Sequence, residues 1–292
     1  MTKRRSLVML TMQLLIIPLL FSSTEINEDL GVGASPAYSP NGRFIAYRGP
    51  AGRINIMDSM GGNARMISTT RHDFNPKWSP DGTRIVFNSY GMGSNQFSIW
   101  IVNEDGTDQH QLIEPESRGD QYPCWSPDGK WIVWSHGYRL WIMKADGQNA
   151  KPLTAVPAKA YEYCGGWSPK GDLIAYIAGD SFSYSSPDYY RIWTIRPDGT
   201  DQKLFGGGVR AEYLKWSQDG KYLYYSVEEG VMKIDSKGIG PETKIMDCGF
   251  AGNRFDLSPD EKWLIHEDEG PDGEGHLHRV AFPQRGEGGM ID

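Results

Sequence analysis

A five-residue phrase, Trp-Ser-Pro-Asp-Gly, returns along this chain of 292 residues. Full copies begin at Trp78 and Trp125, and weaker copies begin at Tyr38, Trp167, Trp216 and Leu257. The serine recurs every 40 to 49 residues, a period typical of solenoids, propellers and other repeat arrays. Proline presets the φ angle that the second residue of a type I turn needs, and glycine accepts the strained exit. The phrase therefore predicts a tight turn that follows a core aromatic ring.

Short apolar runs after each turn predict the strands of one repeating unit. Runs rich in aromatic and β-branched residues follow the turns at Phe44–Tyr47, Ile85–Phe87, Trp131–Trp134, Leu173–Tyr176, Tyr222–Tyr225 and Trp263–Ile265. A short buried helix would also lack alternation, but the length of these runs and the bounding Gly and Pro favour strands. Each unit goes on with a third run such as Ile54–Met57, a glycine-bearing hairpin turn, and a fourth run such as Gln111–Ile113 or Pro152–Thr154. Six units of four antiparallel strands predict an all-β, six-bladed β-propeller.

The first 23 residues predict a signal peptide. Lys3-Arg4-Arg5 precedes an apolar run from Leu7 to Phe21, and small polar residues follow it. The run is short for a membrane span, which needs about 20 apolar residues. We expect cleavage near Ser22 or Ser23, with an uncleaved anchor as the alternative. Residues 1–23 are therefore assigned to the signal peptide and residues 24–292 to a single propeller domain, periplasmic or secreted.

A propeller must join its last blade to its first. The last unit supplies runs at Trp263–Ile265 and Leu277–Phe282, but its fourth strand is doubtful within Gly286–Asp292. The segment Glu25–Leu30 stands where other units carry a fourth strand. We expect it to pair as the outer strand of the last blade, which would remove an open sheet edge.

Charge and cysteine content limit the partners. The formal net charge is −7, and removal of a basic signal peptide would make the chain more acidic. An acidic protein is a poor ligand for nucleic acid and for anionic membranes. Of the three cysteines, Cys124 and Cys164 precede repeat tryptophans on neighbouring inner strands, and the third is Cys248. We expect three buried free thiols, and the alternative is a bridge between Cys124 and Cys164.

The second unit resembles a known family. Pro76-Lys77-Trp78-Ser79-Pro80-Asp81-Gly82, with Ile85 and Phe87 and a later Ile99-Trp100 hairpin, resembles the TolB-type, WD-like β-propeller repeat. The resemblance covers about residues 35–282 and implies the same six-bladed fold. It implies no single function, because such blades occur in periplasmic protein-binding proteins, prolyl peptidases and oligogalacturonate lyases.

Charged residues just before each inner strand are the candidate binding residues. In such a blade the connectors between units lie at one end and the Ser-Pro-Asp-Gly turns at the other. We expect a ligand or peptide site at the channel mouth formed by His72, Asp73, Arg118, Asp120, Tyr161, Glu162, Arg210, Glu212 and Arg254. The alternative is that these mixed charges solvate the mouth and brace neighbouring blades.

Catalytic motifs are missing from the sequence. It has no Gly-x-Ser-x-Gly, His-Glu-x-x-His or Cys-x-x-Cys motif and no phosphate-binding glycine loop. His276 and His278 would share one side of a strand, where His266 or His72 could complete a metal site. His278 nevertheless stands at the repeat position of Trp100, Trp141 and Trp193, which favours a place inside the blade.

We therefore expect no metal, no cofactor and no catalysis. The predicted molecule is a monomeric scaffold that binds a protein or peptide in the cell envelope, without membrane insertion after signal removal. The alternative is a carbohydrate-active or metal-dependent, lyase-like enzyme built on the same propeller.

Overall fold

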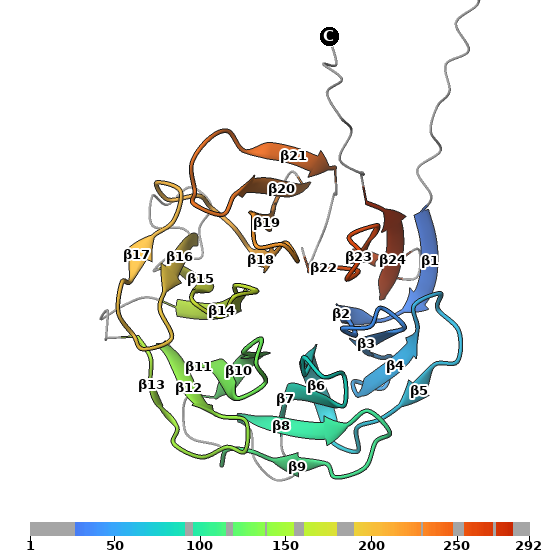
Figure 1. The fold of residues 1–292 in the computed structure, drawn as a ribbon. Helices are drawn as coiled ribbons and strands as arrows, with labels where there is room; N and C mark the ends of the chain where they lie inside the picture. The colour runs from blue at the N-terminus through green and yellow to red at the C-terminus, as the bar shows by residue number, and fades with distance from the viewer. Residues whose placement is uncertain are drawn as a thin grey trace, which may run out of the picture.

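The computed structural model describes residues 27–90, 96–114, 119–137, 139–154, 161–179, 190–228, 230–247, 254–270 and 273–282. Their regular structure is entirely β-strand, arranged as six four-stranded antiparallel sheets around a central axis (Figure 1). The prediction of an all-β, six-bladed propeller is confirmed. Within these ranges we find no helix of the length and apolar character that a membrane span requires.

We number the blades I to VI in chain order and give each from its inner strand outward. Blade I holds β2 (Ala34–Tyr38), β3 (Phe44–Arg48), β4 (Ile54–Asp58) and β5 (Arg65–Met66), and blade II holds β6 (Arg71–Trp78), β7 (Arg84–Tyr90), β8 (Phe97–Asn103) and β9 (His110–Gln111). Blade III holds β10 (Asp120–Trp125), β11 (Trp131–His136), β12 (Arg139–Lys144) and β13 (Lys151–Pro152), and blade IV holds β14 (Tyr161–Trp167), β15 (Ile174–Gly179), β16 (Arg191–Ile195) and β17 (Lys203–Leu204). Blade V holds β18 (Tyr213–Trp216), β19 (Tyr222–Val227), β20 (Gly230–Asp235) and β21 (Thr243–Met246), and blade VI holds β22 (Phe255–Leu257), β23 (Trp263–Glu269), β24 (Gly275–Ala281) and β1 (Asn27–Val32).

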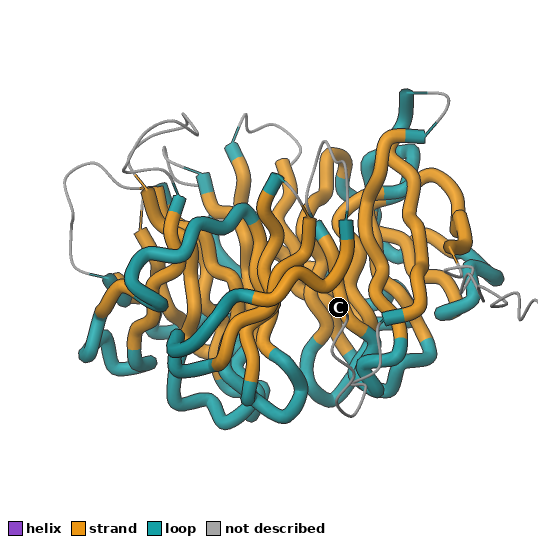
Figure 2. Tube along the Cα trace, turned by 90° about the horizontal axis from the view of Figure 1, so that it is seen from above, coloured by secondary structure: helices purple, strands orange, loops and turns teal. Residues whose placement is uncertain are grey.

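The connections between strands divide between the two faces of the disc (Figure 2). The Ser-Pro-Asp-Gly turns join first to second strands, and the glycine hairpins join third to fourth strands, on the same face. We call this the turn face. The connectors between blades and the loops from second to third strands form the opposite, loop face, as the strand order predicts.

The serine of each repeat organises its turn through its hydroxyl. Ser79 Oγ donates to Asp81 Oδ1 at 2.5 Å and accepts from the backbone N of Arg84 at 3.0 Å. Equivalent bonds recur at Ser39, Ser126, Ser168, Ser217 and Ser258. In the weaker copy at Ser168, where Lys170 takes the acid's place, Asp172 accepts the hydroxyl at 2.7 Å instead. The turn chemistry therefore persists where the sequence phrase weakens.

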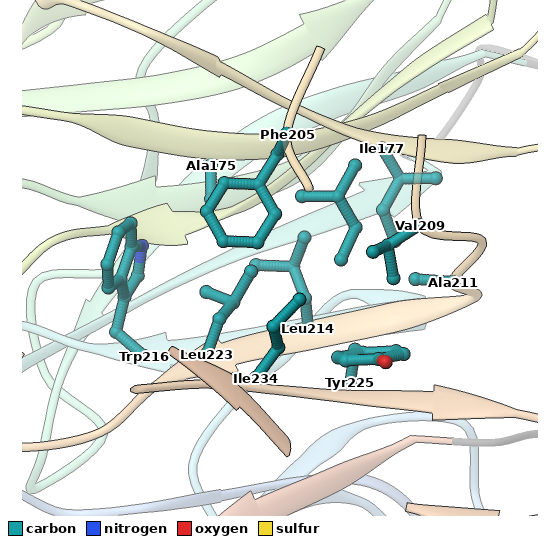
Figure 3. Packing of buried hydrophobic residues seen from close by; sticks show 11 residues of the cluster. Ala175, Ile177, Phe205, Val209, Ala211, Leu214, Trp216, Leu223, Tyr225 and Ile234 are labelled. Atoms are coloured by element: carbon teal, nitrogen blue, oxygen red, sulfur yellow. The ribbon is translucent and has the colours of Figure 1, made fainter. Parts of the chain in front are cut away.

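Apolar side chains from facing sheets fill the space between neighbouring blades. Between blades IV and V, Phe205 packs with Leu214, Leu223 and Ile234 (Figure 3). The backbone N of Phe205, just after β17, donates to Ile192 O at 2.9 Å, and Ile67, Leu112 and Leu153 make the same bond in blades I to III. The outer strands β9 and β13 end earlier than predicted, because these apolar residues follow the strand and anchor the chain inward.

The N-terminal strand closes the ring. β1 pairs antiparallel with β24, with Asn27 opposite Val280 and Val32 opposite His276. The predicted closing strand is thus confirmed, and it continues two residues further than predicted, to Val32; the first two residues of the predicted strand lie outside the described residues. The predicted signal peptide and the doubtful segment Gly286–Asp292 lie outside the described residues.

A buried arginine holds the closing strand in place. Arg279 on β24 is 3% exposed and forms an ion pair with Glu28 on β1. Its guanidinium lies 4.2 Å from the ring centroid of Trp263, and its Nη1 donates to Ser59 O of blade I at 2.9 Å. One side chain therefore ties together β1, β24 and the neighbouring blade.

Cys124 is disulfide-bonded, which corrects the expectation of three free thiols. It lies on β10, and Cys164 lies on β14, the adjacent inner strand of the next blade. Cys248 lies outside the described residues. The bridge between Cys124 and Cys164 stays a prediction, because the spacing of cysteines along the chain does not specify which of them pair.

Candidate functional site: the central channel

A chamber of about 490 Å³ lies inside the ring at the turn face. Its wall consists of the ends of the six inner strands and the turns that follow them. Aromatic residues of the repeat line it, namely Tyr38, Trp78, Trp125, Trp167 and Trp216, together with the turn prolines Pro40, Pro80, Pro127, Pro169 and Pro259. A volume of this size is within the range of small-molecule sites.

The residue just before each repeat ring also lines the chamber. Blades II and V place Lys77 and Lys215 there, and blade VI places Asp256. Lys215 Nζ forms an ion pair with Asp256 Oδ1, and the other oxygen of Asp256 accepts from the backbone N of Tyr38 at 2.7 Å. These three charged groups form the floor of a chamber with largely aromatic and proline walls, and Glu261 lines it as a fourth charged residue.

Two contacts cross the channel between opposite blades. Lys77 Nζ of blade II donates to Tyr213 Oη of blade V at 2.5 Å. The Arg254 guanidinium of blade VI lies 5.8 Å from the ring centroid of Tyr122 of blade III. Burial tends to lower the pKa of Lys77, but the Tyr213 oxygen and the Asp256 carboxylate outweigh it and raise the pKa. These side chains separate the chamber from a second cavity of about 20 Å³, space for about one water.

The small cavity is lined by residues with strained backbone. Ser35, Asn75 and Tyr122 have φ angles of 54°, 54° and 53°, each at an irregularity in the pairing of its inner strand. Each precedes a proline in the sequence, and all three line the cavity with Arg254. A left-handed conformation is unfavourable for a residue with a side chain, and such strain gathers at functional sites. This strain marks the channel as the candidate site.

Tyrosine side chains extend from the channel toward the loop face. Tyr122 packs edge-on against Tyr163 with ring centroids 4.9 Å apart. Tyr163 packs against Tyr190 at 5.3 Å, and the two hydroxyl oxygens lie 2.9 Å apart. We call Tyr122, Tyr163, Tyr190 and Arg254 the tyrosine cluster.

Two of the predicted acids are buried and brace one blade against the next. Asp73 of blade II accepts from Ser68 Oγ, just after the outer strand of blade I, and from Ser89 Oγ, both at 2.5 Å. Glu162 of blade IV accepts from Thr154 Oγ1 at 2.5 Å and from Leu140 N at 2.9 Å, both in blade III. Burial raises the pKa of Glu162 despite these bonds. For these two residues, the contacts agree with the alternative interpretation that charged residues at the mouth brace neighbouring blades.

Asp120, the third of these acids, acts within its own blade. It is fully buried, and its Oδ1 accepts from Trp134 Nε1 at 2.7 Å and lies 2.8 Å from His136 Nδ1. The acid therefore fixes the inner strand against the second strand of blade III.

The other predicted residues are distributed around the mouth. His72 is exposed at a φ of 63° with its ring against Tyr90, and Arg210 is exposed beside β16. Glu212 is half-buried, and burial raises its pKa, followed by repulsion from Glu228. Arg254 lines the small cavity of the channel, and it donates a hydrogen bond to Ser35 Oγ at 2.5 Å. Tyr161 begins β14, and Arg118 lies outside the described residues.

The histidines of blade VI lie next to the closing strand. His266 and His278 stack at 5.6 Å, and His276 Nδ1 lies 3.0 Å from Asp29 Oδ2. Burial lowers the pKa of His266 to about 4. His278 pairs with His266 as Trp141 pairs with Trp134 in blade III, which agrees with its expected place inside the blade. Among the residues with described placement, no three His, Cys, Asp or Glu side chains are grouped so as to hold a metal ion.

Sequence reasoning missed Lys77, Lys215, Asp256 and Tyr213. The first three share one repeat position, immediately before the core ring or its equivalent. Successive side chains point to opposite sides of a strand, so a charged residue at this position does not share the packing of the ring beside it. Charge at that position was the available signal.

Comparison with known proteins supports this fold assignment. Residues 21–163 match the family model of the TolB beta propeller domain. The uncharacterized protein Atu1656 of Agrobacterium fabrum is 27% identical over 221 residues, which are 70% of this chain and 70% of that protein.

Two solved structures share the architecture. A candidate TolB of Agrobacterium tumefaciens superposes with a TM-score of 0.65 at 16% identity, over 87% of this chain and 91% of that one. An oligogalacturonate lyase in complex with manganese superposes with a TM-score of 0.61 at 14% identity, over 86% and 77%. Identity this low shows the fold alone. The repeat, the six blades and the family match identify this chain as a TolB-like β-propeller.

Proposed function

We propose that this propeller is an exported, non-catalytic scaffold that binds a protein or peptide at the loop-face mouth of its channel. The observation that carries the proposal is the tyrosine cluster, which connects strained Tyr122 inside the channel to Tyr190 near the loops. Tyrosine and arginine are the residue types that most often dominate protein interfaces. Tyrosine provides a large contact area and loses little conformational entropy when it is fixed.

The mouth supplies charge around this cluster. His72 and Arg210 are exposed there, and Glu212 is half-buried with a raised pKa. Rim charges of both signs favour selection of a complementary partner more than raw affinity. Arg118 and Tyr161 remain proposed members of the same rim.

Export is part of the proposal. The basic start and apolar run of residues 1–23 support a signal peptide, and the TolB-like family match supports a place in the periplasm. The acidic net charge of −7 suits a protein partner better than nucleic acid. The scaffold is proposed to act as a monomer without a cofactor.

Capture from the envelope fraction of the source organism tests the proposal. The mature protein, immobilised and cross-linked, should retain a specific protein or peptide. The variants Tyr163→Ala and Arg254→Ala should reduce capture at least tenfold, because each removes an interface anchor. Arg65→Ala, an exposed change on the outer edge of blade I, is the matched control and should leave capture unchanged.

Melting curves must show that both test variants remain folded. Equal capture by wild type and by both variants would move the site away from this mouth. Stoichiometric metal in the purified protein, lost in His276→Ala and His278→Ala, would favour the lyase-like alternative.

A further inference from the structure

The turn-face chamber is a second candidate site, independent of the loop-face mouth. It lies on the far side of the crossing made by Lys77 and Tyr213. None of the residues of the proposed partner rim lines the chamber. Only Lys77 and Tyr213 line both this chamber and the small cavity. A ligand there would enter between the turn prolines, which line the chamber opening.

The lysine ammonium groups in this chamber keep hydrogen-bond donors that the described residues do not use. Over the described residues, Lys77 Nζ donates one hydrogen bond, to Tyr213, and Lys215 Nζ donates one, to Asp256. An ammonium group carries three donors, so two remain on each lysine. Both oxygens of Asp256 are already engaged, by Lys215 and by the backbone N of Tyr38. In the described residues, the remaining donors of Lys77 and Lys215 bond to no protein acceptor.

The three groups at the floor of the chamber, Lys77, Lys215 and Asp256, together carry one positive charge. Lys77 and Lys215 face the single interior carboxylate of Asp256. Glu261 also lines the chamber, but it stands at the rim, partly open to solvent, where its Oε1 accepts from Gln218 N at 2.6 Å. Arg254 is on the other side of the crossing, engaged with Ser35 and Tyr122. One excess positive charge at the chamber floor suits a monoanion.

The walls specify the rest of the ligand. Four tryptophans and five prolines surround the charged floor. Such walls favour an apolar body, since apolar surface removed from water contributes about 25 cal/mol per Å². A doubly charged phosphate would carry more negative charge than the floor compensates.

We infer that the turn-face chamber binds an apolar monocarboxylate, with the carboxylate between Lys77 and Lys215 and the apolar part against the tryptophans. The carboxylate can belong to a small organic acid or to the C-terminus of a peptide. Charge-assisted hydrogen bonds to two ammonium groups would hold either one.

Titration calorimetry with the mature protein tests this inference. The compounds are phenylacetate, an apolar tripeptide with a free C-terminal carboxylate, the same tripeptide as its amide, and inorganic phosphate. Phenylacetate or the tripeptide acid should bind, and the amide should not. Binding of the acid peptide alone identifies a peptide terminus, whereas binding of phenylacetate alone identifies a small acid.

Variants locate the ligand in the chamber. Lys77→Met should weaken binding at least tenfold, because it removes a charged donor. The pair Lys215→Met with Asp256→Asn should do the same while conserving net charge, so that no unpaired buried acid remains. Lys130→Met, an exposed change on the same face, is the matched control and should bind as wild type.

Three results would overturn the inference. These are no binding of either carboxylate at millimolar concentration, equal binding by wild type and a folded Lys77→Met protein, and phosphate binding as tight as phenylacetate. Tyr163→Ala should leave carboxylate binding unchanged. Failure of the loop-face proposal is thereby distinguishable from failure of this one.

Discussion

Glu261 Oε1 accepts a hydrogen bond of 2.6 Å from the backbone N of Gln218. In the other five blade junctions the turn glycine faces the turn proline of the preceding blade, as Gly82 faces Pro40 and Gly220 faces Pro169. Gln218 stands where the other five turns have proline, so only this turn has a backbone N–H at that position. Glu261, in the next blade, stands where the other five turns have glycine. The two departures from the repeat compensate each other.

The first prediction concerns this pair. Gln218→Pro removes the donor and should cost about 1 kcal/mol of unfolding free energy. Glu261→Gly removes the acceptor but relieves the left-handed φ of 52° at Glu261, so it should cost less. The double variant should restore the proline–glycine contact of the other junctions and recover most of that loss. A double-mutant cycle by urea unfolding measures the coupling, expected at about 0.5 to 1 kcal/mol. Strict additivity would show that the two residues do not interact.

The closing strand gives the second prediction. Glu28→Ala should destabilise the protein by about 2 to 3 kcal/mol, because it leaves the buried guanidinium of Arg279 without its carboxylate. Glu104→Ala, which breaks an exposed ion pair with Arg65, is the control and should cost less than about 1 kcal/mol. The free energies of unfolding of the two variants and the wild type, measured in denaturant, test this difference.

Deletion of residues 24–31 extends this test to the whole strand. It should lower the melting temperature by many degrees, since blade VI would lose its outer strand. An unchanged melt would contradict the role of β1 in closing the ring.

The third prediction concerns pH. The folded pKa of His266 is about 4, below its ordinary value of 6.5, because the side chain is buried. Between these values the unfolded chain binds a proton that the folded chain excludes, so stability falls as pH drops from 6.5 toward 4. This one histidine should therefore lower the free energy of unfolding by about 2 kcal/mol between pH 7 and pH 5.

Replacement of His266 by phenylalanine isolates its contribution to the pH dependence of stability. His266→Phe places in blade VI the residue type that Phe87 supplies in blade II, and should reduce the loss of stability at pH 5. His110→Phe, at an exposed site, should leave the pH dependence as in wild type. Parallel pH curves for wild type and His266→Phe would contradict the prediction.

The fourth prediction concerns Glu162. Glu162→Ala should cost about 3 kcal/mol, since it leaves the buried donors of Leu140 and Thr154 without an acceptor. Glu162→Gln keeps an acceptor oxygen and should stay within about 1 kcal/mol of wild type at pH 7. Because burial raises the folded pKa, the carboxyl favours the folded state increasingly as pH falls toward its ordinary value of 4.5, and the amide should lack this gain. Urea unfolding of the three proteins at pH 7 and 5 measures both effects.

Local chemistry explains why much of the fold was predictable. The Ser79 hydroxyl, Asp81 and the turn glycine act within a few residues of one another, so the phrase specifies its turn wherever it stands. The sequence predicts the ends of the outer strands less accurately. Leu112 and Leu153 have the apolar character of strand residues, but they follow the strands and anchor the chain inward. The rim acids Asp73 and Glu162 were recognised as important, but their partners lie in the preceding blade and do not appear in any local pattern.

The sequence by itself determined the repeat, the turns, the number of blades and the strand that closes the ring, since each depends on contacts within one unit or on the count of units. Only the tertiary structure decided which residues meet across the axis. Lys77 and Tyr213 are 136 residues apart and touch because a closed ring of six sheets places blade II opposite blade V. The channel and its two candidate sites follow from that closure, because no single blade contains them.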